Sequence, residues 1–406
     1  MPTPRKPSAR PARKPGAKSG PRPGAKPSVK PSVRATAKPK PKAKVSAKAG
    51  AKPRVQAAVK PTVRPASTTA TKPAPRPHAG GMAKVPSLTR VKWSGFRVLL
   101  DFWGQPMKRY YQLETLANAT EAALSWKNSF LYKSVHEALG PADVSALNFE
   151  LFQEGRYQLI FRLRASNIKG GSTQFAYVAA KNHEECSDIA RAEHHNLRTL
   201  YERMPQWVTR PYWGGTVVLP DRHKRKEHDR LVYTYFTSWL NGYEELGVTR
   251  NLQFYVNVEK KHTFTLAETE LLHGQMLEII ASSHDETSRT AMALPQIASG
   301  DFVVNRQGGL KLKLIACRRM QQKITRHKLL SQVLTEGFEW GGRTFKLAPE
   351  EPSTVLAALT RAWGEEAAIG CIRFYLSAVA AGNLPGKKPG YLTELRALIT
   401  EKTQGA

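Results

Sequence analysis

Residues 147–180 read LNFELFQEGRYQLIFRLRASNIKGGSTQFAYVAA, and this stretch decides the fold of the chain. Its apolar residues follow the patterns of β-strands over residues 147–152, 157–163 and 175–180. Glu154-Gly155 predicts a hairpin turn between the first two strands, and Gly170-Gly171 predicts the turn before the third. The stretch therefore predicts three consecutive antiparallel strands.

The sequence on either side of these three strands predicts further helices and strands. Before it, residues 111–139 predict a helix that Gly140-Pro141 ends. After it, the patterns predict a helix over 188–203, strands over 216–219 and 231–236 and a charged turn over 221–229. A helix over 266–283 with a capping box of Thr265 and Glu268 follows, then a hairpin of 302–304 and 310–315 around 307–309. The remainder is predicted helical, so the fold class is α+β.

Charge divides the chain into two unequal parts. The first hundred of its 406 residues hold 25 Lys and Arg and no carboxylate, whereas residues 101–406 hold 38 basic and 32 acidic residues. Residues 1–80 also contain 17 of the 28 prolines and repeat the motif Lys-Pro-Ser-Val at Lys26 and Lys30. Such a segment has too little apolar surface to offset its ordering entropy, so we expect a disordered basic arm over residues 1–91.

The arm predicts a polyanionic partner. Each Lys or Arg that pairs with a phosphate releases a counterion, which favours binding to nucleic acid or another polyanion. The arm resembles the tails of linker histones and of some histone-like bacterial proteins in composition. The alternatives are a targeting peptide, which is normally amphipathic where this segment is interrupted by proline, and a solvated tail without a specific partner.

The cysteines and the apolar runs limit which classes of protein this chain can belong to. The three cysteines, Cys186, Cys317 and Cys371, are odd in number and scattered, which fits neither a disulfide framework nor a zinc site and indicates a reducing compartment. We therefore expect a cytoplasmic protein, associated with the nucleoid or nucleus if the arm binds DNA. The sequence contains no run of eighteen apolar residues, so we expect no membrane-spanning helix.

Four motifs over residues 147–380 resemble the protein-kinase-like fold, particularly its aminoglycoside-phosphotransferase branch. Val178-Ala179-Ala180-Lys181 is similar to the strand motif whose lysine holds nucleotide phosphates. Glu193 falls on the next helix, where the family places the ion-pair partner of that lysine. Phe236-Thr237-Ser238-Trp239-Leu240 matches the hinge that cradles adenine, and Ser299-Gly300-Asp301-Phe302 is similar to the catalytic His-Gly-Asp element.

The resemblance implies a two-lobed architecture and a set of site residues. Residues 147–240 would form an N-lobe of five antiparallel strands and one helix, and residues 241–406 a mainly helical C-lobe, with residues 92–146 as a helical extension before them. Asp301 would be catalytic, and Asn305 would bind the metal. The residues implied to bind ATP are Lys181, Glu193, Phe236 and Trp239, with Lys181 and Glu193 joined as an ion pair.

Departures from the family pattern speak against magnesium and turnover. Ala316 stands where the family has its metal-binding carboxylate, Ser299 stands where it has histidine, and Asn305 follows Asp301 by four residues instead of five. Phosphoryl transfer needs divalent cation charge, and Asn305 alone is a weak ligand set, so either another carboxylate replaces the missing one or this fold does not turn over. Arg318 is a candidate for neutralising phosphate without a metal.

Two further clusters have simpler interpretations. Adjacent helix residues point about 100° apart, so His194 and His195 are poorly placed to share a metal ion. The basic residues 222–226 are interpreted as a solvated loop tip or a secondary phosphate contact.

The sequence thus favours a divergent kinase-like protein or pseudokinase that binds a nucleotide or a partner and is tethered to a polyanion by its arm. One alternative is an active phosphotransferase on a hydroxylated small molecule. Another is a non-enzymatic, nucleic-acid-associated interaction protein.

Overall fold

The computed structural model describes residues 90–95, 112–126, 128–140, 144–155, 157–181, 185–219, 230–249, 253–256, 262–340, 343–346 and 348–404. The chain divides into two units, Met1–Ala74 and Pro75–Ala406, and every described residue belongs to the second. Apart from Arg90 and Val91, the predicted disordered arm lies outside the described residues, as does the basic cluster at 222–226. The described residues form a mixed α+β structure, as the sequence predicts.

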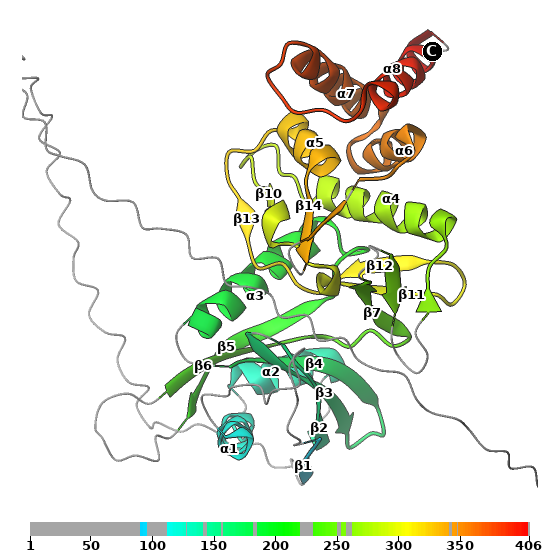
Figure 1. Cartoon of the computed structure of the whole chain (residues 1–406). Coiled ribbons are helices and arrows are strands. Elements are labelled where there is room, and N and C mark those ends of the chain that lie inside the picture. Colours follow the sequence, from blue (N-terminus) through cyan, green and yellow to red (C-terminus); the bar gives the residue numbers. More distant parts are fainter. Residues whose placement is uncertain are drawn as a thin grey trace, which may run out of the picture. The chain divides into compact units, whose positions relative to one another are not determined.

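A six-stranded sheet dominates the first half of the described chain (Figure 1). In spatial order its strands are β1 (Arg90–Ser94), β2 (Val144–Glu154), β3 (Gln158–Asn167), β4 (Ser172–Ala180), β6 (Arg230–Ser238) and β5 (Pro211–Leu219). All neighbouring pairs are antiparallel except β1 and β2, which are parallel. Five of the six strands lie where the sequence predicts them.

The first strand, β1, was not predicted and forms one edge of the sheet. Trp93 fixes it there, because its ring stacks on that of Phe149 in β2 with centroids 4.0 Å apart. The indole nitrogen also donates a hydrogen bond to Glu121 at 2.8 Å. The sheet therefore begins within residues that the sequence assigned to the arm and to a helical extension.

Helices cover both faces of the sheet (Figure 1). Helices α1 (Leu113–Leu124) and α2 (Phe130–Leu139) pack on one face, where the Tyr177 and Thr120 hydroxyls lie 2.9 Å apart. Helix α3 (Glu185–Arg203) packs on the other face, where Tyr235 donates to Glu193. We call these the α1 face and the α3 face, and the position of a side chain on one or the other decides which groups can meet.

The sequence predicts one helix over residues 111–139, but the structure has two separate helices there. Helix α1 ends at Leu124, and α2 begins after Ser129, whose hydroxyl accepts a hydrogen bond from the Tyr132 amide at 3.0 Å. A serine in this position supplies a helix with a new N-terminus, so two helices form where periodicity indicates one. Gly140 ends α2 with φ at 78°, as the sequence predicts.

The second half contains more strand than predicted. A five-stranded sheet has the order β12 (Lys311–Leu314), β11 (Phe302–Asn305), β7 (Tyr243–Val248), β8 (Phe254–Val256), β9 (His262–Thr263). The predicted hairpin is β11–β12, and β7 adds to its free edge. Two small ribbons pair β10 (Ala291–Met292) with β13 (Met320–Gln321), and β14 (Gly337–Trp340) with β15 (Arg343–Lys346).

Helices complete the second half. They are α4 (Leu266–Ser282), α5 (Arg326–Thr335), α6 (Pro352–Trp363), α7 (Glu365–Ala380) and α8 (Pro389–Gln404). Helix α4 begins with the predicted capping box, in which Thr265 and Glu268 each bond the other's backbone amide. No described helix combines the length and apolar character that crossing a bilayer requires. All three cysteines are buried free thiols.

Candidate functional site

Asp301 is placed by a short helical turn and the hairpin that follows it. The turn η2 (Ser299–Asp301) leads into β11, and β12 returns the chain so that the Ile315 amide donates to the Asp301 carbonyl at 2.8 Å. The turn lies beside β7, and a Cβ at Gly300 would meet the carboxylate at the end of the Glu245 side chain. The segment after β12 therefore lies beside Asp301.

Arg318 occupies the centre of the site. Its Nη1 lies 2.7 Å from Asp301 Oδ1 and donates a hydrogen bond to Oδ2 at 2.9 Å. Its Nε lies 3.8 Å from Glu193 Oε2. One guanidinium therefore pairs with two carboxylates from separate parts of the chain, and we call these three residues the Arg318 cluster.

Glu193 reaches the cluster from α3 with its other oxygen fully engaged. Its Oε1 accepts hydrogen bonds from Gln158 Nε2 at 3.0 Å and from the Tyr235 hydroxyl at 2.5 Å. Gln158 lies on β3 and Tyr235 on β6, so two strands of the sheet donate hydrogen bonds to the Glu193 carboxylate. A second tie joins α3 to the same segment, because Asn196 donates to the Cys317 carbonyl at 2.9 Å.

Burial gives the cluster unusual electrostatics. Asp301 and Glu193 are each 1% exposed, and the Arg318 side chain is 30% exposed. Burial raises the pKa of Asp301 from 3.8 to about 7, against the opposing attraction of Arg318. Burial also raises the pKa of Glu193, again against Arg318. Two carboxylates facing one guanidinium favour retention of a proton, since isolated buried charge is costly.

Lys181 does not pair with Glu193, and that prediction is wrong. Its Nζ lies 3.0 Å from Glu154 Oε1, and both side chains are almost completely buried. In the β2–β3 ladder Glu154 lies opposite Leu159, whereas the residue that bonds Glu193 is Gln158. Consecutive strand residues point to opposite faces.

The two ionic groups are therefore separated by the sheet. Glu154, with Lys181 beside it, belongs to the α1 face, and Glu193 belongs to the α3 face. In this arrangement the amine of Lys181 is committed to Glu154 and is not available to phosphate groups next to Glu193.

The two predicted hinge residues differ in accessibility. Phe236 is completely buried on the α1 face, with its ring centroid 5.1 Å from that of Tyr177. Trp239 contacts Phe152 edge-on at 4.9 Å between centroids, and the Arg162 guanidinium lies 5.2 Å from its ring. Only Trp239 adjoins open space.

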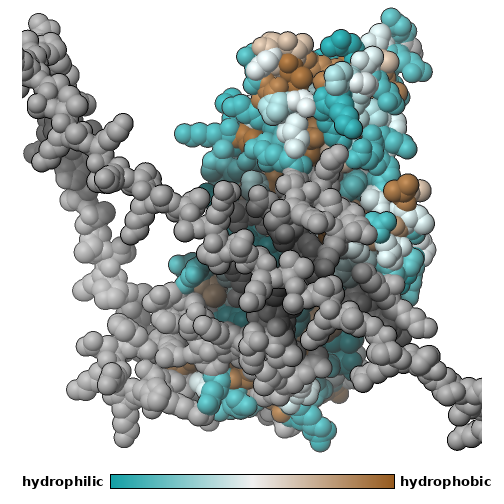
Figure 2. All heavy atoms as spheres, in the orientation of Figure 1, coloured by the Kyte–Doolittle hydropathy of each residue, from teal (hydrophilic) through white to brown (hydrophobic). Residues whose placement is uncertain are grey.

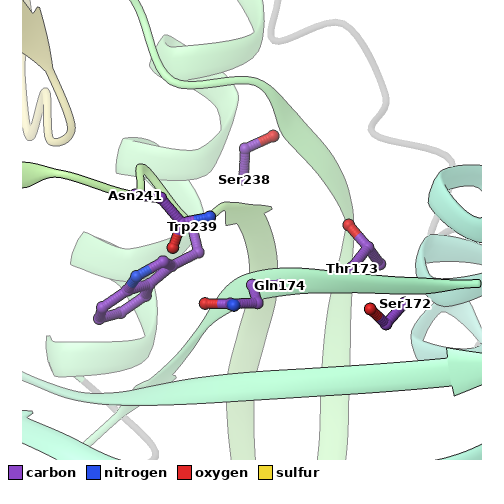
Figure 3. A pocket seen from close by; sticks show the side chains of 6 residues that line it. All are labelled: Ser172, Thr173, Gln174, Ser238, Trp239 and Asn241. Atoms are coloured by element: carbon purple, nitrogen blue, oxygen red, sulfur yellow. The ribbon is translucent and has the colours of Figure 1, made fainter.

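That space is a small polar pocket at the ends of β4 and β6 (Figure 3). Its volume is about 270 Å³, and it is lined by Ser172, Thr173, Gln174, Ser238, Trp239 and Asn241. The lining offers hydroxyl and amide groups but no charge. The Trp239 amide is already occupied, since it donates to the Gln174 carbonyl at 3.1 Å.

The residues present do not fit magnesium. The Asn305 side-chain oxygen accepts a hydrogen bond from the Gln307 amide at 2.7 Å, which makes Asn305 a turn residue of the β11–β12 hairpin. Asp301 is occupied by Arg318, and Ala316 has no donor atom. The described residues contain no group of three His, Cys, Asp or Glu side chains that could hold a metal ion. The position of Lys181 does not fit the binding of nucleotide phosphates either, because its amine is paired with Glu154.

The histidines on α3 are separated as their spacing predicts. His194 is buried, with Nδ1 2.8 Å from the Tyr233 hydroxyl and Nε2 2.8 Å from the Tyr212 carbonyl. His195 is exposed. His194 therefore joins the helix to the sheet.

Sequence reasoning missed three residues that organise the site. Glu154 pairs with Lys181, Gln158 supports Glu193, and Glu245 on β7 accepts a hydrogen bond from Gln153 at 2.9 Å. Burial raises the pKa of Glu245. For Glu154 and Gln158 the only signal in the sequence is an acidic or amide residue beside the turn of the first hairpin, which ordinarily indicates a solvated turn, and Glu245 has no such signal.

No protein-family model and no curated protein sequence matches the chain.

The raised pKa of Asp301 predicts how stability depends on pH. Folded Asp301 retains its proton up to about pH 7, and in the unfolded chain it loses the proton near pH 3.8. The unfolded state therefore binds fewer protons between these values, and the free energy of unfolding falls as pH rises, by up to about 1.4 kcal/mol per pH unit from this group. Urea unfolding at pH 5, 6, 7 and 8 measures the decline, which should be shallower in Asp301→Asn. An identical pH dependence in both proteins would contradict the assignment.

Proposed function

We propose that the globular part is a divergent kinase-like domain without phosphotransferase activity, which acts as a binding module, and that the basic arm tethers it to nucleic acid. The observation that carries this proposal is the pairing of Arg318 with both Asp301 and Glu193. A side-chain cation stands where catalysis would require divalent metal and phosphate.

The order and contacts of the elements support a kinase-like relationship. A hairpin and a third strand precede α3, two strands follow it, and a Gly-Asp turn leads into the β11–β12 hairpin. Glu193 of α3 approaches the segment after that hairpin, where the family places its metal-binding residue. This is the spatial relation that the resemblance implies for the helix, the catalytic Asp and the metal site.

The chemistry of the cluster argues against transfer. Asp301 would have to orient or deprotonate an accepting hydroxyl, but its carboxylate is held by Arg318 and is 1% exposed. The charge of the β- and γ-phosphates would lack a metal, and losing one well-placed electrostatic stabiliser typically costs about 2.7–4 kcal/mol in the transition state. An active phosphotransferase would need Arg318 to leave Asp301 and Lys181 to leave Glu154.

Binding of a macromolecule is favoured over binding of ATP by the same contacts. The polar pocket beside Trp239 is next to the predicted hinge, but the phosphate end of a nucleotide would meet no available lysine and no metal ligands. The arm, by contrast, provides 21 Lys and Arg within residues 1–80 and no carboxylate. Such a segment binds phosphate backbones without reading bases.

Catalytic silence predicts an outcome for ATP turnover. The full chain with ATP and magnesium should hydrolyse ATP no faster than Asp301→Ala, because the groups that would act on the γ-phosphate are paired with each other. A phosphate-release assay on both proteins measures this. Magnesium-dependent turnover that disappears in Asp301→Ala would establish an active enzyme and overturn the proposal.

Tethering by the arm predicts the effect of deleting residues 1–81. Affinity for a 30-base-pair DNA duplex at about 50 mM salt should fall by at least about a hundredfold, since many phosphate contacts are removed together. Fluorescence anisotropy measures the affinity, and thermal melting should change little because the described fold begins at Arg90, after the deleted residues. A chain with residues 1–81 scrambled is the matched control and should bind like the natural one. Equal affinity of the truncated and full chains would exclude the arm as the tether.

A further inference from the structure

A second concentration of positive charge lies in the folded part of the chain. Residues 302–335 contain eight Lys and Arg and no Asp or Glu. Three of the eight are neutralised by carboxylates elsewhere: Arg306 by Glu244, Arg318 within its cluster, and Arg326 by Glu286. Lys311 and Lys313 lie on β12 of the five-stranded sheet. The rest of the charge gathers around the β10–β13 ribbon and the start of α5.

The ribbon brings exposed cations from two segments together. Arg289 precedes β10, and its carbonyl accepts a hydrogen bond from the Ile324 amide at 3.0 Å, which places it beside Lys323. At the other end of the ribbon the Arg319 carbonyl accepts from the Ala293 amide at 3.0 Å. The side chains of Arg289, Arg319 and Lys323 are exposed, and we call these three residues the ribbon surface. Lys328 on α5 adds a fourth exposed cation nearby in sequence.

Backbone strain coincides with this surface. Arg289 has φ at 51° and Lys323 has φ at 57°, and they are the two non-glycine residues with positive φ in the described part of the chain. Such conformations are unfavourable for residues that carry a side chain and persist where the surrounding structure holds them, often at functional sites. Both residues flank the β10–β13 ribbon, and the hydrogen bond from the Ile324 amide to the Arg289 carbonyl brings the two cations together at one end of it.

The nearby carboxylates do not neutralise the ribbon surface. Asp285 pairs with Arg203 at 3.1 Å, and Glu286 pairs with Arg326 at 3.1 Å. Within the described residues no carboxylate lies in ion-pair range of Arg289, Arg319 or Lys323. The positive charge of all three is therefore directed to solvent.

The chemistry of the surface fits a phosphodiester backbone better than a membrane or a protein partner. Its neighbours Thr287 and Gln322 are exposed polar residues whose side chains can donate hydrogen bonds to phosphate oxygens. Large apolar side chains, which anchor protein interfaces and membrane contacts, are exposed elsewhere among the described residues, as on α7, where apolar surface is visible in Figure 2. Cations without apolar anchors are typical of contacts to nucleic-acid phosphates.

We propose that the ribbon surface, formed by Arg289, Arg319 and Lys323, is a second nucleic-acid contact that binds backbone phosphates independently of the arm. It gives the folded part a fixed point of contact, whereas the arm contributes sequence-independent attraction along the strand. The domain would then be held against the nucleic acid on one defined side.

The test is the salt dependence of DNA binding by the full chain. The triple variant Arg289→Gln, Arg319→Gln and Lys323→Gln removes three charges from the ribbon surface. The matched control Lys169→Gln, Lys311→Gln and Arg373→Gln removes three exposed charges elsewhere. Affinity for a fluorescent 30-base-pair duplex is measured by anisotropy between 50 and 200 mM KCl. Each lost phosphate contact should reduce the slope of log K against log salt by about 1.

The expected result is a slope lower by about 2–3 in the ribbon variant and a smaller change in the control. Equal slopes for the ribbon variant and the natural chain, or equal losses in variant and control, would overturn the proposal. Deleting residues 1–81 in each background separates the two surfaces. If the arm were not the tether, deletion would change little while the ribbon variant still weakened binding. If the ribbon surface were not a contact, the truncated proteins with and without the triple substitution would bind alike. Circular dichroism and melting of each variant establish that it is folded.

Discussion

The pairing of one guanidinium with two buried carboxylates is the interaction on which the rest of the site depends. Arg318 draws Asp301 from the turn before β11 and Glu193 from α3 to a common point. Removing one member of a buried ion pair leaves an uncompensated charge and typically costs about 3–5 kcal/mol. The same contacts join the junction of sheet, helix and hairpin and hold the Asp301 carboxylate against Arg318. In the proposed function, these contacts account both for the cohesion of the site and for its lack of catalysis.

The register of the first hairpin is the second constraint. Gln158 and Leu159 are neighbours in β3, yet one supports Glu193 on the α3 face and the other lies opposite Glu154 on the α1 face. A shift of the ladder by one residue would exchange these faces. The present register separates the two ionic groups, and it leaves Lys181 with Glu154 and Glu193 with Arg318.

Local signals in the sequence predicted the elements that local chemistry fixes. The capping box at Thr265, the hairpin turn at Gly155 and the Gly300-Asp301 turn all follow from short motifs. Strand β1 was not predictable because its pairing partner, β2, lies some fifty residues away and the segment RVKWS resembles its basic surroundings. Strand β7 likewise needs the distant edge of β11.

Several residues of the candidate site were predictable from the sequence, but the ion pairs that they form were not. Asp301 and Glu193 do meet in one place, but through Arg318, which the sequence marked only as a candidate for neutralising phosphate. Lys181 follows Ala180, whose ladder partner is Gln158 on the α3 face, so its own face depends on where the strand ends. A motif of four residues does not determine that. The pairing of Lys181 with Glu154 is therefore a property of the folded sheet.

A double-mutant cycle between Arg318 and Asp301 tests this account most directly. The free energy of unfolding of the natural chain, Arg318→Gln, Asp301→Asn and the double variant would be measured by urea denaturation at pH 8, where Asp301 is mainly ionised. If the two side chains stabilise the fold as a pair, the double variant should lose at least about 1 kcal/mol less than the sum of the single variants. Additive losses, equal within about 0.5 kcal/mol, would mean that the pair does not hold the site together and would contradict the account.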